Sequence, residues 1–222
     1  MKILLFLIMC LAALLLFQCA AHTNLEPVGK ENLAVDISMG GPIVKAFGTR
    51  IPVPYFTTGV NYGLKDNLDL TGTLHLLSLP YKIFGMEPGV TWYPIQQKGK
   101  IPTIGIQPHA LILMSLKSGV DERIKCYPVL SGSAAWHMKK GLIYTGADLT
   151  VRLSDLDYNK DESPMIFSPF LGYKWKLGSR TWLCTELKWN GANLQTDQLA
   201  VEYLDIGSHG AITTLFSIQR SF

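Results

Sequence analysis

The chain has 222 residues, of which 48% are hydrophobic and 17% are charged, and its formal net charge is +3. Its Lys and Arg residues are dispersed along the sequence and form no basic stripe, so we exclude nucleic acid as a partner. The five histidines show none of the close pairings that zinc sites use. We therefore expect no metal and no cofactor.

The N-terminal part of the sequence is typical of a secretion signal. Its apolar run over residues 3–17 is shorter than the roughly 20 residues of a membrane-spanning helix. Residues 16–19 resemble a bacterial lipobox, although Gln18 stands where that motif prefers a small residue; cleavage there would remove residues 1–18 and leave a lipid on Cys19. Small residues at Cys19 and Ala21 also allow ordinary cleavage before His22, and both alternatives stay open.

Residues 19–31 are polar and rich in turn residues, which predicts a tether in the periplasm ahead of a single domain over 32–222. From residue 32 onward, apolar and polar residues alternate, as they do on the two faces of a β-strand. Because bacterial single-chain barrels have an even number of strands, we assign residues 199–206 to the last outer loop. Ten strands are then predicted, with eight and twelve as alternatives: 32–39, 53–62, 68–79, 86–94, 103–116, 125–138, 142–153, 165–177, 181–190 and 211–222.

The hairpin over residues 58–79 shows the pattern most clearly. In its second strand Leu68, Leu70, Leu74 and Leu76 alternate with polar residues, over a length that matches the roughly 9 to 11 residues a tilted strand needs to cross a bilayer. The turns after every second strand are short and the loops between them are longer and more polar, as in outer-membrane barrels. The apolar face is therefore expected to contact lipid.

Two sets of residues follow from this orientation. Aromatic residues beside the short turns predict an interfacial girdle, made of Tyr62, Trp92, Tyr93, Trp136, Tyr144, Tyr173, Trp175 and Trp182. Ionisable residues on the polar faces would be costly in a soluble core, so they are placed in the lumen as an ion-paired plug: Asp69, His75, His109, Asp148, Arg152, Lys174, Glu186 and Lys188. Cys126 and Cys184 fall near opposite rims, which predicts two free thiols.

The corner at residues 62–70, the alternating strands and the C-terminal Phe222 resemble the family of small bacterial outer-membrane β-barrel proteins. A terminal Phe after the apolar Phe216 and Ile218 is similar to that family's signal for the barrel assembly machinery, although Arg220 interrupts it. The resemblance implies an all-β, closed, antiparallel up-and-down transmembrane barrel. It also implies contact with outer-membrane lipids, with short periplasmic turns and longer outer loops.

We interpret the protein as a non-enzymatic barrel whose outer loops, especially 154–163 and 191–209, contact the environment or an unknown partner. His75 and Ser78 stand at an odd spacing, which places them on opposite faces of a strand, so we expect no catalytic pair there and no catalytic residue. The alternative is a narrow channel or ligand-binding barrel for a small solute. Weaker alternatives are an outer-membrane lipid-modifying enzyme and a soluble lipocalin-type barrel.

Overall fold

The computed structural model describes residues 21–46, 48–117, 123–153, 163–196 and 202–222. Almost all of this chain is extended, and one short 3-10 helix, η1 (Leu79–Tyr81), lies between two strands. The strands are β1 (Leu33–Ala46), β2 (Thr49–Pro52), β3 (Tyr55–Lys65), β4 (Leu68–His75), β5 (Ile83–Ile95), β6 (Thr103–Ser115), β7 (Ile124–Met138), β8 (Gly141–Val151), β9 (Met165–Lys176), β10 (Thr181–Gln195) and β11 (His209–Ser221).

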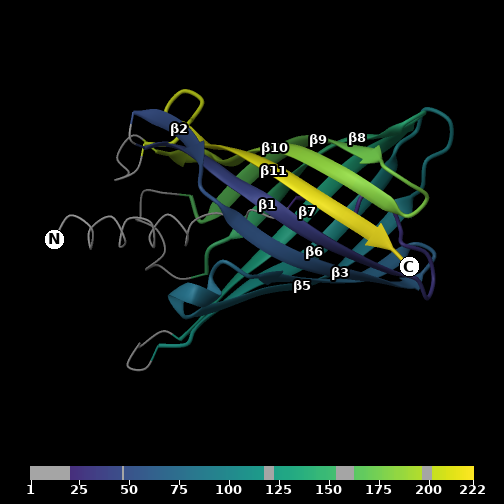
Figure 1. The fold of residues 1–222 in the computed structure, drawn as a ribbon, viewed down its shortest axis with the longest axis horizontal. Helices are drawn as coiled ribbons and strands as arrows, with labels where there is room; N and C mark the ends of the chain where they lie inside the picture. The colour runs from purple at the N-terminus through teal and green to yellow at the C-terminus, as the bar shows by residue number, and fades with distance from the viewer. Residues whose placement is uncertain (1–20, 47, 118–122, 154–162, 197–201) are drawn as a thin grey trace.

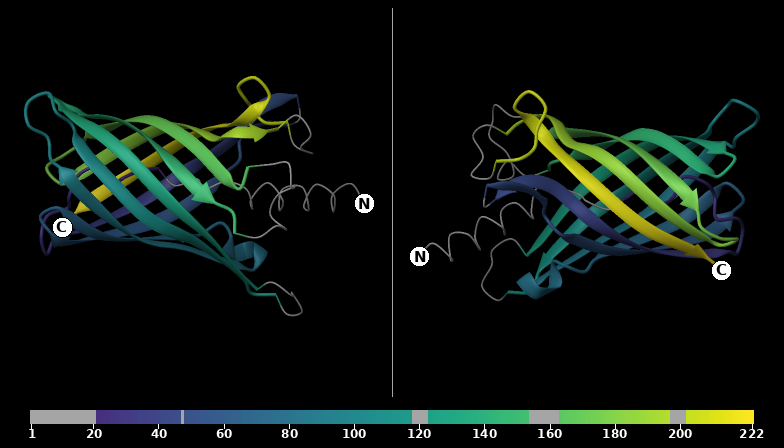
Figure 2. Two further views of the ribbon diagram at one scale, coloured as in Figure 1. Left: turned by 180° about the vertical axis from the view of Figure 1, so that it is seen from behind. Right: turned by 45° about the horizontal axis from the view of Figure 1, so that its top comes forward.

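The sheet closes on itself through β1 and β11. Strands β3 to β11 pair with their neighbours in chain order, β1 pairs with β3, and β11 returns to β1 with Ala34 opposite Ser221. Every pairing is antiparallel, so β1 and β3–β11 form the closed ten-stranded barrel that the sequence predicts (Figures 1 and 2). The short β2 is an addition, because it pairs with the far end of β1 and extends it as a hairpin.

The two ends of the barrel differ. At one end, here called the turn rim, strands are joined by the turns at residues 66–67, 96–102, 139–140 and 177–180, and the C-terminus lies there (Figure 1). The opposite end, here called the loop rim, carries η1 and β2. Residues 202–206 lie outside the strands at the loop rim, as predicted for the last outer loop, and residues 197–201 lie outside the described part.

The apolar face of the strands points outward. Ile37 in β1 is 63% exposed, while its neighbours Asp36 and Ser38 are buried inside. A closed barrel satisfies every backbone hydrogen bond of its ladder, and an apolar exterior then suits lipid. The protein is therefore an outer-membrane β-barrel. Among the described residues, no helix has the length and apolarity needed to cross a bilayer.

The residues of the predicted aromatic girdle lie beside the short turns, but three of them do not lie on the outer face of the barrel. Tyr93 and Tyr144 are only 1% and 0% exposed and point into the lumen. Trp182 also faces inward, with its ring 5.4 Å from Nζ of the buried Lys174. Level along the barrel does not decide the face, because neighbouring residues of a strand point to opposite sides. The predicted members that lie on the outer face are Tyr62, Trp92, Trp136, Tyr173 and Trp175.

The first predicted strand, 32–39, is too short. Gly40 and Gly41 have φ of +147° and +151°, and β1 continues through them to Ala46. A Cβ on Gly40 would lie 2.1 Å from the carbonyl oxygen of Thr214 in β11. Glycine is therefore what lets β1 pass close to β11 in this backbone conformation and continue as the hairpin with β2.

Candidate functional site

The described N-terminal residues, 21–31, are here called the N-terminal segment. Residues 21–28 lie inside the barrel, and Lys30 and Glu31 are exposed at the turn rim, so the segment does not form the tether in the periplasm that the sequence predicts. At the turn rim the Glu31 N–H donates to the Gly63 carbonyl at 2.8 Å. Deeper in the lumen the Val28 N–H donates to Asp69 Oδ2 at 3.0 Å. The segment therefore runs from the turn rim into the barrel.

Apolar contacts also hold the N-terminal segment. Leu25 is fully buried in a cluster with lumen-facing residues of β7 to β10. Glycines on the same wall make room for the cluster's rings: a Cβ on Gly172 would lie 2.2 Å from the Tyr144 ring, and one on Gly146 would lie 2.5 Å from the Phe170 ring. The lumen is thus largely polar, and Leu25 fills an apolar pocket on this wall, while Ala21 packs in a second apolar cluster with Tyr55 and Leu215.

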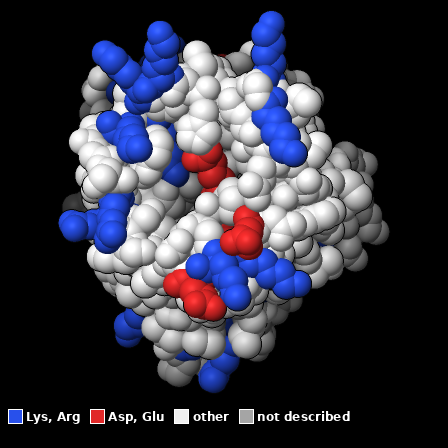
Figure 3. Space-filling view, turned by 90° about the vertical axis from the view of Figure 1, so that its right-hand side faces the viewer, with Lys and Arg blue, Asp and Glu red and all other residues white. Residues whose placement is uncertain are grey.

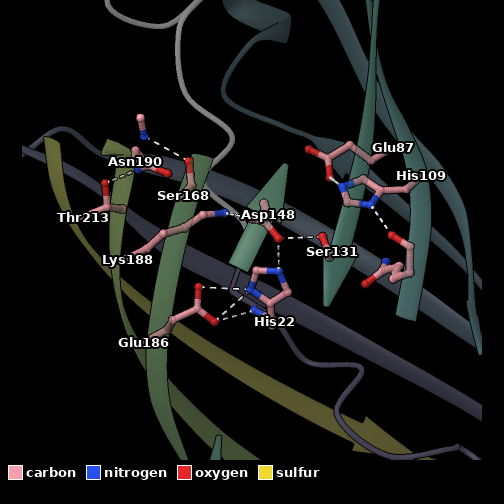
Figure 4. Close-up of polar contacts among 12 residues, drawn as sticks. His22, Glu87, His109, Ser131, Asp148, Ser168, Glu186, Lys188, Asn190 and Thr213 are labelled. Atoms are coloured by element: carbon pink, nitrogen blue, oxygen red, sulfur yellow. Dashed lines mark hydrogen bonds and ion pairs between the residues drawn. The ribbon is translucent and has the colours of Figure 1, made fainter. Parts of the chain in front are cut away.

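His22 follows Ala21 near the inner end of the segment, where it meets two carboxylates of the barrel wall (Figure 4). Its ring Nε2 lies 3.0 Å from Asp148 Oδ1, and Nδ1 lies 3.1 Å from Glu186 Oε2. Its backbone N–H donates to the same Glu186 oxygen at 2.9 Å. The imidazole is stacked on Phe170, with ring centroids 3.8 Å apart and an interplanar angle of 13°. Asp148 and Glu186 are here called the acidic pair.

The acidic pair has further partners on the wall. Asp148 forms an ion pair with Lys188 and accepts a hydrogen bond from Ser131 Oγ at 2.6 Å. Glu186 accepts one from the Tyr144 hydroxyl at 3.0 Å. All these side chains are buried, so they are held with little exchange of partners with water.

A second cluster occupies the other side of the lumen, and it is built from wall residues of β3 to β6. His75 Nε2 lies 2.8 Å from Glu87 Oε1, and His109 Nε2 lies 3.7 Å from Glu87 Oε2. The Tyr55 hydroxyl is hydrogen-bonded to His75 Nδ1. We call His75, Glu87 and His109 the histidine cluster.

The eight predicted lumen residues all lie inside the barrel, but they do not form one network. Three of them meet around His22, and two meet around Glu87. Lys174 holds the N-terminal segment by donating to the Thr23 carbonyl at 3.0 Å, and Asp69 does so through Val28. Arg152 stands apart near the loop rim, where its guanidinium binds the carbonyl of Ser163.

Sequence reasoning missed His22 and Glu87 as members of these clusters. Glu87 shares its strand face with Thr91 and Tyr93, so alternation alone contained the signal for it. His22 lies in a polar stretch without periodicity, and no local pattern places it beside Asp148. Its role follows only from the folded chain.

A small cavity lies between the N-terminal segment and the wall. Its volume is about 40 Å³, and polar side chains of both clusters line it, among them His22, Glu87, His109, Asp148 and Lys188. A buried water needs roughly 10–15 Å³ of such volume, so the cavity holds a few waters at most. Among the described residues, this space beside His22 is too small for a solute.

The Ser131 and Ser78 hydroxyl groups are not arranged for nucleophilic attack. Ser131 donates to Asp148, which separates it from the His22 ring, whereas an activated serine needs a base at its own hydroxyl. Ser78 lies beyond the end of β4 and donates to the His75 carbonyl at 2.8 Å, while the His75 ring points into the lumen. The described geometry is suited to holding charge.

The turn rim is basic. Figure 3 looks onto this end of the barrel and shows Lys and Arg side chains around the mouth, with few acidic ones. The exposed basic residues of the rim are Lys30, Lys65, Lys98, Lys100, Lys139, Lys140, Lys176, Arg180 and Arg220. The mouth is thus positively charged, whereas the buried interior carries carboxylates.

Other predicted sites are placed as follows. Phe222 lies at the closing seam, where its N–H donates to the Leu33 carbonyl at 2.8 Å; its role as an assembly signal remains a prediction. Cys126 is exposed and Cys184 is buried, and both are free, which confirms that prediction. Cys19 and nearly all of the loop 154–163 lie outside the described residues.

No family model matches the chain, and no curated protein sequence is significantly similar to it. Among solved structures, the COG4313 outer membrane channel from Pseudomonas putida F1 is 10% identical with a TM-score of 0.49, covering 91% of this chain and 100% of that one. The NanC porin is 12% identical with a TM-score of 0.47, covering 85% and 98%. The outer membrane protease OmpT from Escherichia coli is 10% identical with a TM-score of 0.43, covering 86% and 97%.

Proposed function

We propose that the protein is a non-enzymatic outer-membrane barrel that forms a narrow passage for small hydrophilic cations, and that the N-terminal segment closes this passage. One observation carries the proposal. The segment fills the lumen through contacts with side chains of the wall, and it is covalently attached to the barrel only at its turn-rim end, before β1. Its release would uncover a polar, charged interior.

The sign of the solute follows from the buried charges. With histidines counted as neutral, the described wall buries five carboxylates and three Lys or Arg side chains, so its formal charge is negative: Asp36, Asp69, Glu87, Asp148 and Glu186 against Arg152, Lys174 and Lys188. Charges in the narrowest part of a pore control which ions pass. The basic residues of the turn rim are exposed to solvent, so salt screens their effect more strongly.

Recording in planar bilayers under a KCl gradient tests this proposal. A variant lacking residues 22–28 should conduct in resolved, cation-selective steps, and the full-length barrel should remain closed most of the time. Leu25→Asp should act in the same direction because it places a charge in the apolar pocket. Leu177→Asp is the matched control, since Leu177 is 60% exposed at a turn. A folded barrel without residues 22–28 that carries no current would refute the passage.

A second candidate is a non-conducting barrel whose outer surface contacts a partner, and the contacts of residues 202–206 at the loop rim favour it. The hairpin of β1 and β2 is joined to residues 202–206: the Lys45 N–H donates to the Glu202 carbonyl at 2.9 Å, and the Leu204 N–H donates to the Ile43 carbonyl at 2.8 Å. Val44 and Tyr203 are buried together there. A silent deletion variant in the bilayer experiment would favour this alternative.

A further inference from the structure

The backbone nitrogen of His22 occupies a site suited to a positive charge. It lies 2.9 Å from Glu186 Oε2, and the Glu186 side chain is fully buried. The His22 ring approaches both oxygens of the same carboxylate, with Nδ1 at 3.2 and 3.1 Å. The carboxylate is therefore directed at the start of His22 from two sides.

An ammonium group would satisfy this site better than an amide. An amide nitrogen offers one neutral N–H, whereas an α-ammonium offers three donors and a full charge, and hydrogen bonds between charged groups are roughly twice as strong as neutral ones. The barrel wall, with five buried carboxylates against three buried Lys or Arg side chains, also has negative charge to neutralise. The wall charges thus point to a cation at the position of the His22 nitrogen.

We infer that the secretion signal is removed between Ala21 and His22, and that the α-ammonium group so created is bound by Glu186 inside the barrel. The sequence suits this cleavage, because small residues stand one and three positions before it, at Ala21 and Cys19. A signal peptidase would add water across the Ala21–His22 amide bond. Ala21 keeps the oxygen as a carboxylate, and the His22 amine takes up the proton. This inference holds whether or not the barrel conducts.

The competing modification, a lipid on Cys19, fits this geometry poorly. Cys19 is three residues from His22, which allows at most roughly 11 Å of extended chain. Glu186, which binds His22, lies five residues from Thr181 and nine from Gln195 at the two ends of β10, which is roughly 16 Å or more of strand in either direction. With His22 docked, acyl chains on Cys19 would begin inside the polar lumen, away from the bilayer.

Intact-mass and peptide mass spectrometry of the protein purified from outer membranes tests the cleavage. The expected N-terminal peptide begins at His22 and carries an unmodified α-amino group. A diacylglyceryl-modified Cys19, or a mature chain that begins at any other residue, would overturn the inference. The result does not depend on bilayer recordings, so it separates this inference from the proposed passage.

Reductive methylation with formaldehyde tests the docking. In the folded barrel the His22 α-amine should be labelled at least about tenfold more slowly than in the urea-unfolded chain, as expected for a buried charged hydrogen bond. In Glu186→Gln most of that protection should be lost, whereas Glu202→Gln, an exposed carboxylate at the loop rim, should leave it unchanged. Exposed Lys98 provides the reference amine. Equal labelling of the folded and unfolded wild-type chains would overturn the docking even if no variant folds.

Discussion

The two sides of the lumen hold their charges in different ways. In the histidine cluster, His75, Glu87 and His109 all belong to barrel strands, so the wall supplies both the histidines and the carboxylate that they face. In the acidic pair, Asp148 and Glu186 are bridged by His22, which belongs to a segment that is not part of the barrel. The contacts of the histidine cluster are therefore independent of the N-terminal segment, whereas the acidic pair would lose its contacts with His22 if the segment left the lumen.

The difference also concerns how each side can respond to the loss of a charge. Glu87 faces two histidine rings, and an imidazole in its neutral form needs no counter-charge. Asp148 faces the ammonium group of buried Lys188, and breaking a buried ion pair is costly.

The largest expected effect follows from this contrast. Asp148→Asn should lower the free energy of unfolding by about 3–5 kcal/mol, because it removes the carboxylate charge from the buried Asp148–Lys188 ion pair. Glu87→Gln should cost about 1 kcal/mol at neutral pH, since it removes the carboxylate contacts with two histidine rings and leaves an amide of similar shape in their place. Urea unfolding in detergent micelles measures both values. Equal losses of free energy of unfolding in the two variants would show that removing a carboxylate charge costs the same on both sides of the lumen.

The lipid face should not distinguish the two sides. Leu74 in β4 and Leu187 in β10 stand six residues past the starts of their strands and are both exposed on the outer face. Leu74→Arg and Leu187→Arg should each cost about 2–4 kcal/mol if the two positions lie near the bilayer midplane. The measurement is unfolding in lipid vesicles. If the two variants differ in free energy of unfolding by more than about 1 kcal/mol, then the strands of the two sides themselves differ in stability, and not only the charges that they hold in the lumen.

The smallest expected effect is local. A Cβ on Gly63 would lie 1.8 Å from the Gly29 carbonyl oxygen, so Gly63→Ala should displace the N-terminal segment at the turn rim. Because the barrel ladder remains, the free energy of unfolding should change by no more than about 1 kcal/mol.

NMR provides the measurement for Gly63→Ala: the ring signals of His22 should shift, while those of His75 should not. Gly132→Ala is the matched control, since a Cβ there meets no atom within 4 Å. Unchanged His22 signals in Gly63→Ala would mean that the rim contact does not hold the segment in place.

Much of the barrel could be predicted because the relevant signal is local. Alternation such as Leu68 to His75 depends only on residues within one strand, and it predicted the ten strands and the outward apolar face. The same rule, applied strictly, would also have placed Tyr93 and Glu87 in the lumen, since both alternate with outward residues of β5. The error for Tyr93 came from weighing level along the barrel above position in the strand, whereas Glu87 was left out of the predicted lumen set although its strand face was predicted to be polar.

The sequence by itself therefore determined the class of fold, the lipid-facing surface and the set of ionisable residues that face inward, because a period of two is written into each strand. Only the tertiary structure decided which of those residues meet. Closing the barrel brings β7, β8 and β10 around one space, and the entry of residues 21–31 into it places His22 between Asp148 and Glu186. His22 is separated from Asp148 by 126 positions in the chain and from Glu186 by 164, and no local sequence pattern records either contact.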